Sequence, residues 1–143
     1  MATTTFKSLT DTTYDSLEGY RKAAEKADHP QLKQALQQRA QMREQTLQQM
    51  NAELESQGDE LVTKGTMTGE AHQMWADITG LFESNDEAAA ERVEEGEDYI
   101  KGKFESALED ENLQAGERQV VQQCFNEICE GARFGDMIEQ MAD

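Results

Sequence analysis

The sequence has 143 residues, enough to bury a sizeable core without disulfides or metals, and we expect a single domain over residues 1–143. Hydrophobic residues make up 36% and charged residues 30% of the chain, with a single proline, which favours a helical protein over a disordered tail or an all-β chain. The net charge of -17 would repel phosphate backbones and anionic lipids, so we expect no nucleic-acid and no membrane partner. Solubility, or adaptation to a salty cytoplasm, is the simplest interpretation of this acidity, and cation storage or a basic protein partner is the alternative.

Two local features favour a cytoplasmic protein. The N-terminal stretch has no basic segment followed by an apolar one, and no apolar run approaches the length that crosses a bilayer. Cys124 and Cys129 are five residues apart on one expected helix, a spacing that points the two thiols in different directions. We therefore expect two buried free thiols instead of a disulfide.

Apolar residues recur every three or four positions in five successive segments, which predicts helices. The first expected helix covers about residues 5–27. The second covers about residues 30–57, because Pro30 suits a first helical turn and Gly58 suits a helix end. The inner stripes of these two helices are formed by Phe6, Leu9, Thr13, Leu17, Tyr20 and Ala24, and by Leu32, Ala35, Leu36, Leu47, Met50 and Leu54.

A shorter helix is expected over about residues 68–82, after a polar stretch bounded by glycines, and we interpret it as a crossover. Ser84 and Glu87 form a capping-box pattern before a fourth helix over about residues 85–108. The inner positions of that helix include one carboxylate, and they are Ala89, Val93, Glu97, Ile100, Phe104 and Leu108.

The last expected helix covers about residues 113–141, and its apolar sector shifts near Gly131 and Gly135. Glycines inside a helix weaken it, so these two indicate a bend or a close helix contact, here or across a dimer interface. Two long helices, a crossover and two more long helices predict an all-α, ferritin-like antiparallel four-helix bundle with a short additional crossover helix. We expect a homodimer or a higher homo-oligomer, with the face from Phe134 to Met141 as the candidate contact surface.

The metal ligands of ferritin-like proteins are incomplete in this sequence. Their dimetal centres need a Glu-x-x-His motif on each of two helices, and here Lys26 and Gly69 stand three residues before the only two histidines, His29 and His72. We therefore predict no catalytic residue, no cofactor and no complete metal site. An iron or manganese site would have to be built from the carboxylates Glu94, Glu97 and Glu127.

The most informative feature is a pair of arginines in the middle of an apolar stripe. Arg39 and Arg43 interrupt the inner stripe of the second helix, and an unpaired guanidinium in a core would cost several kcal/mol. Glu97 could accept a bidentate bond from them, with Glu94 and Glu127 flanking, in a buried ionic cluster. The alternative is that both arginines lie at the edge of the bundle or pair across a subunit interface.

His72 and Trp75 lie on one face of the crossover and resemble a small-molecule or cation site. The simpler interpretation is that Trp75 anchors the crossover against the bundle, with His72 at the apolar margin. The acidic run around Glu94 and Glu95 is interpreted as a solvated face from which only Glu97 points inward.

The chain resembles an uncharacterised family of bacterial ferritin-like four-helix-bundle proteins, a domain-of-unknown-function family. The stretches that carry the resemblance are Asp15–Ala24, Leu32–Met42, His72–Trp75, Gly96–Asp98 and Phe104–Leu108. The chain departs from the family pattern at Ala132, where a histidine is expected after Glu127 and Ile128, and at Ser16, where a glycine is usual. The resemblance implies the bundle fold and a bacterial source, and it supplies no activity.

Three classes of function remain open. The sequence favours a non-enzymatic helical protein with a stress-related binding or structural role. The first alternative is a carboxylate-rich iron or manganese binder or oxidase, with a site that is incomplete or shared between subunits. The second is an adaptor or cargo domain that docks through one helix face.

Overall fold

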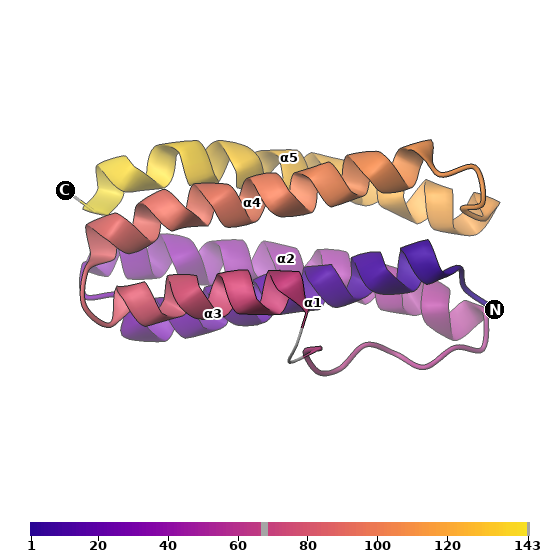
Figure 1. Ribbon diagram of the computed structural model, residues 1–143, viewed down its shortest axis with the longest axis horizontal. Helices are drawn as coiled ribbons and strands as arrows, with labels where there is room; N and C mark the ends of the chain where they lie inside the picture. Colours follow the sequence, from indigo (N-terminus) through magenta and orange to yellow (C-terminus); the bar gives the residue numbers. More distant parts are fainter. Residues whose placement is uncertain (67–68, 143) are drawn as a thin grey trace.

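The computed structural model describes residues 1–66 and 69–142, which form five packed helices (Figure 1). The predicted all-α class is confirmed. Two antiparallel pairs of long helices lie side by side, and a shorter helix covers part of one side (Figure 1). The helices are α1 (Thr4–Lys26), α2 (Pro30–Ser56), α3 (Glu70–Phe82), α4 (Asp86–Glu109) and α5 (Ala115–Ala142). The expected start of the crossover helix at Thr68 lies outside the described residues.

The end of α2 shows how the sequence stops a long helix. Gly58 adopts a positive φ of 78°, a conformation that glycine reaches without steric cost. Its N–H donates to the carbonyl of Glu55 at 3.0 Å, and the N–H of Asp59 donates to the carbonyl of Leu54 at 3.0 Å. These two bonds form a Schellman motif, which satisfies carbonyls at the helix end and turns the chain away.

The start of α4 differs from the expectation by one residue. The N-cap is Asn85, whose side chain accepts a hydrogen bond from the N–H of Ala88 at 3.1 Å. The predicted capping box of Ser84 and Glu87 is therefore wrong. The Ser84 hydroxyl instead donates to the carbonyl of Leu81 at 3.4 Å, in the turn that follows α3, so it does not cap α4.

The apolar core is divided into two clusters along the length of the protein. One cluster surrounds Trp75 and Leu36, and the other surrounds Phe104 and Met50. Buried polar side chains of α1, α2 and α4 lie near the boundary between the two clusters. They are those of Thr13, Ser16, Arg43, Thr46 and Glu97. The boundary of the two apolar clusters is thus lined by a buried polar layer.

Trp75 fixes α3 in the groove between α1 and α4, the two helices that α3 contacts (Figure 1). A Cβ atom on Gly19 would lie 2.5 Å from the Trp75 ring, and one on Gly96 would lie 2.9 Å from it. Real Cβ atoms do not approach so closely, so each glycine makes room for the indole.

None of the described helices combines the length and the apolar character needed to cross a membrane.

Candidate functional site

Arg43 on α2 is a fully buried cation whose N–H groups all have acceptors. Nη1 donates to Ser16 Oγ and to Glu97 Oε1, both at 2.9 Å. Nη2 donates to Glu97 Oε2 at 2.8 Å and to Glu127 Oε2 at 3.1 Å, and Nε donates to Glu127 Oε1 at 2.8 Å. A guanidinium carries five N–H donors in a fixed geometry, so none is left unpaired here. Acceptors from α1, α4 and α5 therefore converge on one side chain of α2.

Glu97 and Arg43 form a bidentate pair in which neither side chain is exposed. This is the strongest arrangement available to an arginine and a carboxylate, because two parallel bonds fix the geometry as well as the charge. Gly131 on α5 lies directly over the pair. A Cβ atom at that position would lie 1.7 Å from Glu97 Oε2 and 2.6 Å from Arg43 Nη2. Only glycine allows α5 to close over the buried charges.

Glu127 on α5 connects the pair to a second arginine. Its Oε1 atom accepts a hydrogen bond from Thr46 Oγ1 at 2.8 Å, in addition to the one from Arg43. Its Oε2 atom accepts from Arg39 Nη2, which also donates to the main-chain carbonyl of Glu127 at 3.1 Å. Arg39 is 7% exposed, and its Nη1 atom lies 3.9 Å from the surface carboxylate of Glu130.

These residues form what we call the ionic network: Arg39, Arg43, Glu97 and Glu127, together with Ser16 and Thr46. Two full positive charges and two full negative charges balance within it. Replacing water around buried ions costs several kcal/mol per ion, and the cost is offset only when the pairing and hydrogen bonding are nearly complete. The network meets that condition for Arg43 and both carboxylates.

The electrostatics keep Arg43 and Glu127 ionised. Burial alone would lower the pKa of Arg43, but the carboxylates of Glu97 and Glu127 outweigh it and hold this pKa well above its usual value. Burial also opposes ionisation of Glu127, yet the charges of Arg43 and Arg39 and its hydrogen bonds with Arg43 and Thr46 hold its pKa below the usual range. Neither group is therefore available as a general acid or base near neutral pH.

Tyr20 on α1 borders the network without bonding to it. The Cζ atom of Arg43 lies 5.7 Å from the centre of the Tyr20 ring, within the range of a cation–π contact. Burial, followed by the charge of Glu97, raises the pKa of the Tyr20 hydroxyl well above its usual value. This hydroxyl has no hydrogen-bond partner within the described part of the chain.

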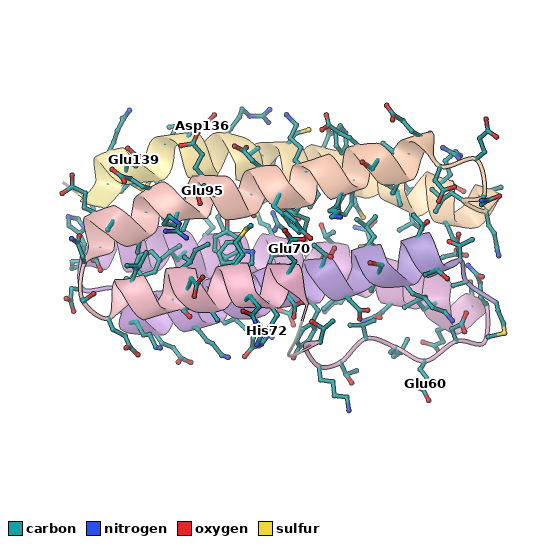
Figure 2. All side chains as sticks on the ribbon, viewed as in Figure 1. Glu60, Glu70, His72, Glu95, Asp136 and Glu139 are labelled. Atoms are coloured by element: carbon teal, nitrogen blue, oxygen red, sulfur yellow. The ribbon has the colours of Figure 1, made fainter. Side chains whose placement is uncertain are left out.

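Glu94 lies outside the ionic network, although the sequence suggested it as a flanking member. A hydrogen bond with Asp136, together with desolvation and the negative charges around it, raises the pKa of Glu94. The Cα atom of Glu94 would lie 2.9 Å from a Cβ placed on Gly135, so α4 and α5 are in close contact here. Figure 2 shows neighbouring acidic side chains, including Glu95 and Glu139, along this edge of the molecule.

His72 and Trp75 are close to each other but apart from the network. Trp75 is 2% exposed, and its ring centre lies 4.8 Å from that of Tyr20. His72 stands at the beginning of α3 (Figure 2), and its Nδ1 atom is 3.7 Å from Oδ1 of the buried Asp15. A cavity of about 60 Å³ adjoins these side chains. Trp75 holds α3 in place, whereas His72 reaches a carboxylate of α1.

Sequence reasoning missed a further buried carboxylate, Glu117, near the start of α5. It is fully buried and accepts hydrogen bonds from the N–H and hydroxyl of Thr3, at 3.0 and 2.8 Å. It also accepts from the N–H of Gln114 at 3.0 Å and from the side chain of Gln57 at 3.1 Å. The spacing of Gln114 and Glu117 resembles half of a capping box, which was the available signal. Glu117 ties three parts of the chain together.

The chemistry open to these groups is limited. Among the described residues, no group of three or more His, Cys, Asp or Glu side chains could jointly hold a metal ion. Burial and the charge of Glu127 raise the pKa of the Cys124 thiol to about 11, so this thiol is protonated and unreactive near neutral pH. Cys129 is half-buried, whereas the sequence suggested that both thiols are buried.

A family model for a domain of unknown function, DUF2383, matches residues 1–110. The chain belongs to this family. The DUF2383 match covers α1 to α4 and includes Arg39, Arg43 and Glu97, whereas Glu127 and Gly131 on α5 lie beyond it. Comparison with curated proteins and with solved structures finds no match.

Proposed function

We propose that this protein is a ferritin-like four-helix bundle in which the ionic network takes the place of a metal centre. Its role is then non-enzymatic: a cytoplasmic structural or binding protein of the kind used under stress. The observation that carries the proposal is that Arg43 has every N–H group bonded and that Glu97 and Glu127 are its acceptors. Two free cysteines fit a reducing compartment.

The connectivity supports the bundle assignment. α1 pairs with α2 and α4 pairs with α5, and the two hairpins pack together through α2 with α5 and α1 with α4. One long connection, residues 57–85, joins the hairpins and contains α3. A single long crossover between two helical hairpins is the ferritin-like arrangement among four-helix bundles.

The geometry favours this role over the metal-binding alternative. Nη2 of Arg43 lies within hydrogen-bond distance of one oxygen of Glu97 and one oxygen of Glu127. A divalent cation would need those same oxygens as ligands, and its charge would be opposed by the guanidinium already between them. Glu94, the third candidate ligand, lies outside the network, next to Asp136.

Elemental mass spectrometry of the purified protein tests the proposal. The protein is produced in medium supplemented with iron and manganese, and the Glu97→Gln variant is prepared in parallel. We expect both to contain only trace metal. Stoichiometric iron or manganese in the wild type that is lost in the variant would overturn the proposal and establish the metal-binding alternative.

A further inference from the structure

The outer surface of α2 is free of charge over most of its length. Between residues 31 and 52, every exposed position of α2 is a glutamine except Ala52. Charged residues make up 30% of the sequence, so a long exposed helix would ordinarily carry several. The only charged side chains of this stretch are buried or half-buried, and the half-buried Glu44 is paired with Arg21 at 3.1 Å.

The neighbouring part of α5 has the same character. Between residues 119 and 126, every exposed position of α5 is a glutamine or an asparagine. The two helices pack against each other, and the Oε1 atom of Gln49 on α2 lies 3.6 Å from Sγ of Cys124 on α5. We call the exposed residues 31–52 of α2 and 119–126 of α5 the amide face.

The opposite side of the protein is built differently. Every exposed position of α4 is charged except Ser106, and acidic residues predominate among them. α3 contacts α1 and α4, and Figure 1 shows α2 on the far side of the molecule from α3. Within the described residues, no helix covers the amide face. The net charge of -17 is therefore carried mainly by the other surfaces.

We propose that two copies of this chain associate through the amide face. Two molecules with a charge of -17 each repel one another, and the repulsion is smallest when their uncharged surfaces meet and their acidic surfaces point apart. A side-chain amide is both a donor and an acceptor, so identical glutamines can bond to each other across a two-fold axis. Carboxylates facing each other across such an axis would repel.

The size of the amide face fits a weak dimer interface. At a rise of about 1.5 Å per residue, residues 31–52 of α2 span about 33 Å and residues 119–126 of α5 span about 12 Å. With helices about 10 Å wide, the face covers about 450 Å² per molecule. Stable dimers bury about 800 Å² on each partner and transient ones bury less than about 600 Å², so we expect a dimer that dissociates readily on dilution. The sequence suggested another contact face, from Phe134 to Met141. Phe134 and Met141 pack against the core, so the main exposed apolar side chain of that face is Met137, which is 55% exposed.

Sedimentation velocity over a range of protein concentrations tests the proposal. The test variant, Gln38→Glu/Gln45→Glu, adds two negative charges to the amide face of each molecule. The control variant, Gln73→Glu/Ser106→Glu, adds the same charge to exposed positions of α3 and α4. Glutamine and glutamate have similar helix propensities, and circular dichroism verifies that each variant is folded.

We expect a wild-type dimer whose dissociation constant rises at least tenfold in the test variant and changes by less than twofold in the control. Higher salt should tighten the wild-type dimer, because salt screens the repulsion between acidic surfaces. A wild type that stays monomeric at every concentration would overturn the proposal. So would a control variant that dissociates as readily as the test variant, or a test variant that remains dimeric. None of these results depends on whether the ionic network replaces a metal centre.

Discussion

Replacing Glu97 by leucine is expected to destabilise the protein by about 3–5 kcal/mol, because it leaves Arg43 as a buried cation without its bidentate partner. Nη1 and Nη2 of Arg43 would each lose one hydrogen bond, and Glu127 alone could not neutralise both guanidinium groups. Domains of this kind unfold with a free energy of about 5–15 kcal/mol, so the variant should lose a large part of its stability.

The same reasoning predicts a much smaller effect when the whole network is removed. A variant with Arg39→Leu, Arg43→Met, Glu97→Leu and Glu127→Leu leaves no unpaired buried charge. Buried ion pairs replaced by apolar side chains of similar volume are often neutral or more stable, by about 1–4 kcal/mol. We therefore expect the fourfold variant to be more stable than the single Glu97→Leu variant.

Urea unfolding followed by circular dichroism measures both effects. Glu95→Leu, an exposed position two residues from Glu97 on α4, is the matched control and should change the free energy of unfolding by less than about 0.5 kcal/mol. A Glu97→Leu variant as stable as this control would refute the account of the network. A fourfold variant much less stable than Glu97→Leu would refute it as well.

Three further predictions follow from the same contacts. Gly131→Ala should destabilise the protein by several kcal/mol, because its Cβ would lie 1.7 Å from a buried carboxylate oxygen. Its control in the same urea assay is Gly102→Ala, which has open space around it and should stabilise the protein by about 0.5–1 kcal/mol. Because the pKa of Glu127 is lowered in the folded state, its stabilising contribution is complete above its ordinary pKa of 4.5 and is lost as the pH falls through the folded-state pKa. Glu127→Gln should therefore flatten the acid side of the curve of unfolding free energy against pH. Cys124, with a pKa of about 11, should react with a thiol reagent at pH 8 only as fast as the protein unfolds, and rapid labelling in the native state would contradict its burial.

Much of the fold follows from the sequence because helix periodicity and caps are local properties. The stripe of the first helix, from Phe6 to Ala24, is buried as the spacing predicts. The same spacing puts Arg43 and Glu97 on inward faces, and the structure brings the two side chains together. The position of a cap is less certain from sequence, because Ser84 and Asn85 are both good caps and the preceding helix decides between them.

The remaining parts of the site depend on distances between helices, which the sequence does not contain. Periodicity drifts along a long helix, so it could not tell that Glu127 enters the network while Glu94 turns to Asp136. Gly131 and Gly135 of α5 indicated a bend or a close contact, but the role of Gly131 depends on the position of α4 opposite it. Glu117 was missed because its partners come from distant parts of the chain.

The central claim is that Arg43 holds the carboxylates that a metal ion would otherwise bind. Titration of the wild-type protein with Mn²⁺, followed by electron paramagnetic resonance, measures this directly, with Glu97→Gln as the control. The account predicts that both proteins leave the Mn²⁺ signal at the intensity of the free ion. Stoichiometric loss of that signal with the wild type, abolished in Glu97→Gln, would show that a metal displaces Arg43 and would contradict the account.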